Sequence, residues 1–250
     1  MYPLREIQYD PPNPLPHRYP FNLAALNGFR TMPLTCPTTF LIGDNGSGKS
    51  SFLEAVAHAA GLQVEGGSAN MFVDEPRTNV ELSEAIHLVW TVKSKNGFFF
   101  RAETLYHLAN YLDDMAKESG ADQAFQAYGG RSLHHRSHGE SFLALFANRL
   151  DPSRPALYLF DEPESALSTT AQFAFLQLLK RWENSGQAQM MIATHSPILL
   201  AYPNAQIWDF DACPMRPTTY EASSPYQLTR AFLESPERFL KSLLADDRDL

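Results

Sequence analysis

The chain has 250 residues, of which 44% are hydrophobic and 19% are charged, and its formal net charge is −8. This length suffices for one sizeable domain with a buried core. The acidic balance argues against a surface that is basic throughout, which wholesale binding of a phosphate backbone would need. The two cysteines, Cys36 and Cys213, lie far apart and indicate reduced thiols rather than a disulfide framework.

The N-terminal sequence has no apolar run flanked by basic residues, so we expect no secretory signal. No apolar segment approaches the roughly 18 residues that a membrane helix needs. We therefore expect a cytoplasmic protein without membrane insertion, with residues 1–250 forming a single domain.

Alternating strands and helices predict an α/β fold with a largely parallel central sheet. Apolar runs predict strands at 38–43, 85–92, 97–103, 156–160, 189–194 and 205–210. The strands at 85–92 and 97–103 are joined by the turn-like KSKNG. Helix formers and apolar stripes predict helices at 49–61, 103–120, 140–150 and 168–186.

The strongest motif is GDNGSGKS at residues 43–50, which matches G-x-x-x-x-G-K-[ST] between a predicted strand and a predicted helix. Its glycines let successive backbone N–H groups surround phosphate oxygens, and the helix that follows adds its positive end. Lys49 can reach the β- and γ-phosphates, and the Ser50 hydroxyl can bind Mg²⁺. The predicted nucleotide-binding residues are Gly43, Asp44, Asn45, Gly46, Ser47, Gly48, Lys49, Ser50 and Ser51.

Two adjacent carboxylates, Asp161 and Glu162, end the apolar run at 156–160. A P-loop enzyme needs one carboxylate near magnesium and benefits from another that orients or deprotonates the attacking water. We assign the first role to Asp161 and the second to Glu162.

His195 follows the predicted strand at 189–194, which should lie beside the strand that ends at Asp161. It can therefore emerge at the same edge of the sheet, and we expect it to sense the γ-phosphate or to position the water. A serine hydrolase is disfavoured because the sequence has no G-x-S-x-G nucleophile elbow.

The order of the P-loop, SHGES, LYLFDEPESALS and IATHSP resembles the ATPase heads of the ABC superfamily, and the SMC, RecF and RecN-like branch more than the transporters. Nearly the whole chain also resembles a family of short, stand-alone predicted AAA-type ATPases of bacteria, through GFFFRAET, SHGESFLALF, ATHSPILLAYP and SPERFL. The resemblance implies a P-loop NTPase with an antiparallel β part and a helical signature lobe at approximately 103–150. It also implies ATP and Mg²⁺ as cofactors and an ATP-dependent homodimer.

By the same resemblance, the ABC signature falls on residues 136–140, and Ser137, Gly139 and Glu140 would contact the ATP held by the other subunit. Arg136 and His138 depart from the family's leucine and first glycine. The glutamine loop of the superfamily points to the sequence FFFRAET, where Arg101 and Glu103 are candidates and Glu103 would contact magnesium through water. A solvated strand end remains the alternative for that segment.

The histidines of SLHHRSHGESF also raise the alternative of a zinc site, with His134 and His138 as ligands and His135 or Glu140 as a third. Adjacent His134 and His135 cannot share one helical face, and no cysteine lies near. The order of the motifs therefore favours a loop that closes over phosphate.

The sequence has no long heptad run, and little follows the last motif, so we expect no appended nuclease and expect any effector to be another chain. We predict an ATP-hydrolysing engine or switch for a separate partner protein, in DNA maintenance or phage defence, with DNA binding left open. The alternatives are the ATP-binding subunit of an ABC transporter and a nucleotide-sensing module that does not hydrolyse ATP.

Overall fold

The computed structural model describes residues 2–62, 80–94, 96–101 and 154–244, and its strands form two sheets. The larger sheet has the order β5-β6-β7-β3-β8-β9, and all its strands are parallel except β9. These strands are β3 (Thr38–Ile42), β5 (Gly97–Arg101), β6 (Ala156–Asp161), β7 (Ala188–Ala193), β8 (Gln206–Asp209) and β9 (Arg216–Thr218). The predicted α/β class with a mainly parallel sheet is confirmed.

The smaller sheet is antiparallel, with β1 (Leu4–Tyr9) between β2 (Thr31–Pro33) and β4 (Ile86–Trp90). Strands were expected near β4 and β5, and both exist. The segment between them does not pair them, because β4 belongs to the small sheet and β5 to the large one.

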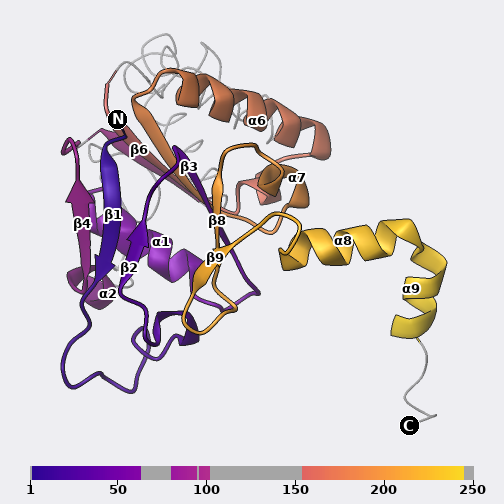
Figure 1. The fold of residues 1–250 in the computed structure, drawn as a ribbon, viewed down its shortest axis with the longest axis horizontal. Coiled ribbons are helices and arrows are strands. Elements are labelled where there is room, and N and C mark those ends of the chain that lie inside the picture. Colours follow the sequence, from indigo (N-terminus) through magenta and orange to yellow (C-terminus); the bar gives the residue numbers. More distant parts are fainter. Residues whose placement is uncertain (1, 63–79, 95, 102–153, 245–250) are drawn as a thin grey trace, which may run out of the picture.

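Helices follow β3, β6 and β7 of the large sheet (Figure 1). After β3 comes α1 (Lys49–Ala59), after β6 come the 3₁₀-helix η4 (Pro163–Ala166) and α6 (Thr169–Asn184), and after β7 comes α7 (Pro197–Leu200). Two short helices, η1 (Ala24–Leu26) and α2 (Val80–Glu84), complete the N-terminal part. The helices expected at 49–61 and 168–186 are confirmed, whereas those at 103–120 and 140–150 lie outside the described residues.

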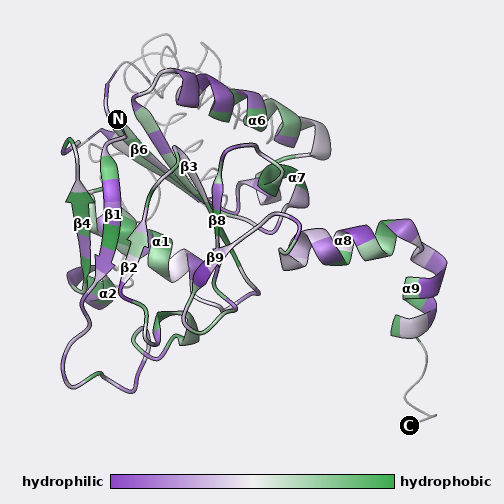
Figure 2. Cartoon of the chain, in the orientation of Figure 1, coloured by the Kyte–Doolittle hydropathy of each residue, from purple (hydrophilic) through white to green (hydrophobic). Residues whose placement is uncertain are grey.

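The side chains of the central strands alternate between two apolar clusters, one on each face of the large sheet. On β6, Tyr158 and Phe160 pack with α6, whose Trp182 is 1% exposed. Leu157 and Leu159 belong to the cluster that also contains Phe52 of α1. Figure 2 shows that hydrophilic and hydrophobic residues are interspersed along α6, as this one-sided packing requires.

Two further helices, α8 (Ser224–Glu234) and α9 (Pro236–Leu243), form an arm that leads away from the sheets (Figure 1). None of the residues in either helix is buried. Among the helices that the structure describes, none combines the length and the hydropathy needed to cross a membrane.

Candidate functional site

The predicted motifs meet at the carboxyl edge of the large sheet because β7 lies between the two strands that carry them. Ala193 at the end of β7 pairs with Leu41 of β3 on one side and with Asp161 of β6 on the other. The loop at 43–50 and the segment containing His195 continue from these strand ends. Crevices outside the carboxyl ends of parallel strands are where open α/β sheets bind ligands.

The loop at 43–50 turns tightly around glycines and presents backbone N–H groups at the start of α1. Gly43 has φ +145°, and a Cβ there would lie 2.8 Å from Ser47 Oγ and 3.1 Å from Asp211 Oδ1. Asp211 holds the loop from outside, since its Oδ1 accepts from the Asp44 backbone N–H at 2.8 Å. The first N–H groups of a helix have no acceptor within it, so this end of α1 can bind an anion.

Lys49 is folded back onto the loop that carries it. Its Nζ donates to the backbone oxygens of Gly43 at 2.6 Å and Asp44 at 3.0 Å. Burial lowers the pKa of Lys49, and the nearby carboxylates, Glu162 first among them, partly oppose that effect. The ammonium group therefore sits close to the loop's inner surface, where a bound phosphate would offer it stronger acceptors.

Ser50 and Asp161 come together although 111 positions separate them, and Ser50 Oγ donates to Asp161 Oδ1 at 3.0 Å. Burial raises the pKa of Asp161 to about 6, while the Arg101 charge and the Ser50 hydrogen bond act in the opposite direction. Hydroxyl and carboxylate oxygens are ligands that Mg²⁺ prefers. The donor set therefore fits the magnesium site that the sequence predicts.

A partly buried ion pair that the motifs did not predict lies beside Asp161. Arg101 Nη1 contacts Glu54 Oε1 at 2.6 Å, and Arg101 Nε lies 3.7 Å from Asp161 Oδ2. Arg101 was one candidate for the glutamine-loop position, but Glu54 was not singled out. The sequence feature that could have indicated Glu54 is its position four residues after Ser50, within an apolar run. This spacing places the two residues on the same face of α1.

Glu162 and His195 face each other at the edge of the sheet, with His195 Nε2 3.5 Å from Glu162 Oε1. Glu162 has φ +46°, a left-handed conformation that is uncommon for a residue with a side chain. Both side chains are partly open to solvent, at 42% for Glu162 and 36% for His195. A carboxylate and an imidazole in this arrangement can share a water molecule and move its proton.

Glu164 is a second residue that sequence reasoning missed. Its Oε1 accepts from the backbone N–H of His195 at 2.6 Å, and burial raises the pKa of its carboxyl group. The only sequence signal was a third acidic residue in DEPE, directly after the pair already assigned.

Of the aromatic residues before the P-loop, Tyr19 reaches the site and Phe21 does not. The Tyr19 hydroxyl shares a hydrogen bond of 2.6 Å with Ser51 Oγ, and the ring is 52% exposed. Phe21 is 5% exposed and packs in the core.

The remaining predicted residues lie outside the described part of the chain: Glu103, Ser137, Gly139, Glu140 and the histidines of the zinc alternative, His134, His135 and His138. Within the described residues, no group of three or more histidine, cysteine, aspartate or glutamate side chains is placed to hold a metal ion.

A family model with the description "AAA domain, putative AbiEii toxin, Type IV TA system" matches residues 38–128 and 125–201. The chain belongs to this family. The matched residues of this AAA domain include the P-loop, Asp161, Glu162 and His195, so the nucleotide motifs lie within the part that defines the family. The predicted resemblance to an AAA-type family is thereby confirmed.

Solved structures that are similar to this AAA domain include ABC and SMC heads at low identity. An Smc head bound to the C-winged helix domain of ScpA has 13% identity and a TM-score of 0.49, with 88% of this chain and 98% of the other covered. The protein cbiO1 from Clostridium perfringens, part of an ABC transporter complex, has 16% identity and a TM-score of 0.49, with 94% and 97% covered. The SMC head domain from Thermotoga maritima has 15% identity and a TM-score of 0.42, with 88% and 99% covered. No curated protein matches the sequence.

Proposed function

We propose that the protein binds ATP with Mg²⁺ at the carboxyl edge of the large sheet and hydrolyses it. The observation that carries this proposal is the 3.0 Å hydrogen bond from Ser50 to Asp161 beside the P-loop, with Glu162 and His195 at the same edge. A phosphate cradle, an oxygen-donor pair for a cation and an acid–base pair are the parts that phosphoryl transfer to water needs.

Each group has a separate task in the proposed reaction. Lys49 and the N–H groups at the start of α1 hold the phosphates, while Ser50 and Asp161 hold the cation. Bound Mg²⁺ supplies neutralisation of charge on the phosphate oxygens. Glu162 orients the attacking water and accepts its proton, and His195 hydrogen-bonds to the water or to the γ-phosphate.

The proposed working form is an ATP-dependent homodimer in which Ser137, Gly139 and Glu140 of one copy close over the nucleotide of the other. The partial exposure of the Glu162 and His195 side chains supports this arrangement. In such a dimer ATP would favour closure, and loss of the γ-phosphate would favour opening. Residues 1–250 would act as one ATPase domain, with the signature lobe at approximately 103–150.

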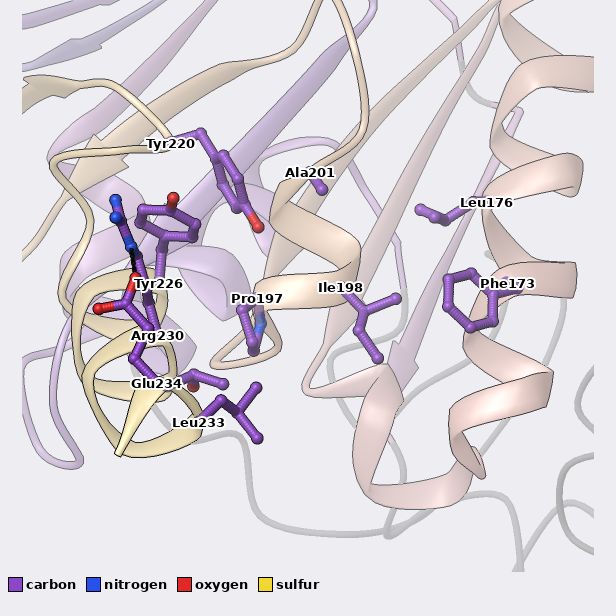
Figure 3. A pocket seen from close by; sticks show the side chains of 11 residues that line it. Phe173, Leu176, Pro197, Ile198, Ala201, Tyr220, Tyr226, Arg230, Leu233 and Glu234 are labelled. Atoms are coloured by element: carbon purple, nitrogen blue, oxygen red, sulfur yellow. Dashed lines mark hydrogen bonds and ion pairs between the residues drawn. The ribbon is translucent and has the colours of Figure 1, made fainter. Parts of the chain in front are cut away.

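The dimer would drive a separate effector protein, and the α8–α9 arm supports a protein partner. An apolar hollow of about 590 Å³ lies between α6, α7 and α8. Phe173, Ile198 and Leu233 are among the side chains that line it (Figure 3). On the arm itself, Leu243 is 67% exposed. Exposed apolar surface of this kind marks contacts with other proteins, and an amphipathic helix is the partner segment that such a hollow fits.

The family description refers to a toxin of a toxin–antitoxin system, which supports phage defence as the setting more than DNA maintenance. The formal net charge of −8 gives no support for DNA as a direct ligand.

The Glu162→Gln variant tests the proposed function, with Glu237→Gln on exposed α9 as the matched control. We expect Glu162→Gln to bind ATP, to accumulate as a dimer in light scattering with ATP and Mg²⁺, and to lose phosphate release. Glu237→Gln should hydrolyse like the wild type. Normal hydrolysis by Glu162→Gln would refute the assigned base. ATP-dependent dimerisation of the wild type without turnover would instead identify a nucleotide-sensing module.

A further inference from the structure

We propose that Glu164 is a positioning residue for hydrolysis, which holds His195 against Glu162 through the His195 backbone. This inference rests on the proposed function. Glu164 lies in η4, two residues after Glu162, and its side chain turns inward to the loop that follows β7. There its Oε1 accepts from the backbone N–H of His195 at 2.6 Å.

Two of the contacts that join the segment with Glu162 to the segment with His195 are made by backbone N–H groups. One is the hydrogen bond from the Glu162 N–H to the Ala193 oxygen, at 2.9 Å. The other is the contact of Glu164 with His195, at 2.6 Å. The first tie precedes the Glu162 side chain and the second follows it, so they hold the backbone on both sides of the carboxylate whose Oε1 lies 3.5 Å from His195 Nε2.

The turn around Glu162 is itself constrained by hydrogen bonds, so the backbone from which the Glu164 side chain extends is held in place. The backbone N–H and the hydroxyl of Ser165 both donate to the backbone carbonyl oxygen of Glu162, at 3.1 Å and 2.7 Å. Glu162 keeps its left-handed φ of +46° within this turn. A strained residue of this kind persists only where its surroundings determine the conformation.

A carboxyl group that is buried at this position requires a hydrogen-bond partner. Moving a carboxyl group out of water is unfavourable unless hydrogen bonds replace the lost hydration, so an apolar side chain would fill the space at lower cost. The His195 N–H lies beyond the last residue of β7 and has no place in the strand ladder. Glu164 supplies its acceptor and thereby sets where the His195 side chain begins.

The same loop contains a matched control that does not touch His195. Ser196 Oγ donates to Gln172 Oε1 at 2.6 Å, which ties the next residue to α6. Gln172→Leu removes this tie and loosens the loop one residue away. Glu164→Leu removes the tie to His195, and Glu164→Gln keeps an oxygen that can accept from the His195 N–H.

Turnover and ATP affinity should respond differently to these variants. We expect Glu164→Leu to lower kcat by about 10- to 100-fold, a part of what a positioned acid–base group contributes, with the dissociation constant for a non-hydrolysable ATP analogue changed less than about twofold. Glu164→Gln should recover most of the lost kcat. In a His195→Ala background, Glu164→Leu should cause almost no additional loss, because the two residues act as a unit.

Any of three kinetic results would overturn the inference: wild-type kcat in Glu164→Leu, an equal loss of kcat in Gln172→Leu, or multiplicative losses in the Glu164→Leu/His195→Ala double variant. NMR of the His195 ring gives a readout without turnover. Its signals should respond to Glu162→Gln in the wild type and lose that response when Glu164→Leu is also present; a retained response would contradict the inference. Wild-type turnover that is insensitive to Glu162→Gln would instead refute the proposed function.

Discussion

Ser50 Oγ donates to Asp161 Oδ1 across 3.0 Å and so connects the first turn of α1 to the end of β6. Asp161 ends β6, and Ser50 lies in the helix that follows β3; β7 separates these two strands in the sheet. Their oxygens point to one place beside the P-loop, which is why we treat them as a single cation site.

The Asp161→Asn variant should lose magnesium-dependent hydrolysis. Asparagine keeps the size of the side chain but not the negative charge that a hard cation prefers. We expect turnover to fall by roughly 100-fold or more, as when one charge-stabilising group is removed from an active site. Phosphate release measured across a magnesium titration checks this, with Asp10→Asn in the exposed loop after β1 as the control. Equal magnesium dependence in Asp161→Asn and the wild type would exclude the cation site.

The same substitution should stabilise the protein when nucleotide and magnesium are absent. The folded state raises the pKa of Asp161 from 3.8 to about 6, mainly through burial. Its contribution to stability is therefore fully present below about pH 3.8 and is lost as the pH rises through about 6. At pH 7.5, Asp161→Asn should be more stable than the wild type by at most about 3 kcal/mol, and the difference should shrink below pH 5.

Chemical unfolding with a chelator at several pH values measures this difference. A less stable Asp161→Asn at pH 7.5 would show that the Arg101 charge, 3.7 Å away, outweighs the cost of burial. Loss of hydrolysis together with a gain in stability would mark Asp161 as a residue kept for function.

The Arg101–Glu54 pair should matter for folding. Removing one partner of a buried ion pair typically costs about 3–5 kcal/mol, because the other charge remains buried. We expect Arg101→Met to approach this loss in urea unfolding, since Glu54 is only 6% exposed. The double variant Arg101→Met/Glu54→Leu should lose less than the sum of the single variants, and additive losses would indicate that the pair is not coupled.

The sequence was enough to predict the residues whose position depends on a local pattern. The P-loop is contiguous, and Asp161, Glu162 and His195 each follow an apolar strand whose neighbours in a parallel sheet can be anticipated. The central strands and the helices after them could be predicted for the same reason. The assignment of β4 and β5 to different sheets could not be predicted, because an apolar run indicates a strand but not its partner.

Glu54 and Glu164 were missed because their roles depend on tertiary contacts with residues that are distant in the sequence. Glu164 acts on a backbone group 31 positions away, and Glu54 pairs with an arginine 47 positions away. A glutamate in a helix or after a strand is ordinarily a solvated surface residue. Only burial distinguishes Glu54 and Glu164 from such surface residues, and burial depends on the packed fold.

The Gly43→Ala variant should separate loop geometry from general stability. Gly43 has φ +145°, and an added Cβ would meet Ser47 Oγ, Asp211 Oδ1 and Phe210 Cβ within 3.1 Å. We expect ATP affinity to fall at least tenfold, about 1.4 kcal/mol, because the loop must shift away from the start of α1. Gly61→Ala is the matched control: it also has a positive φ, +76°, but nothing lies within 4 Å of its Cβ. Gly61→Ala should lose about 1 kcal/mol of stability from its backbone conformation and keep its ATP affinity. Equal ATP affinity in Gly43→Ala and Gly61→Ala, measured by calorimetry, would show that the close packing around Gly43 does not shape the nucleotide site.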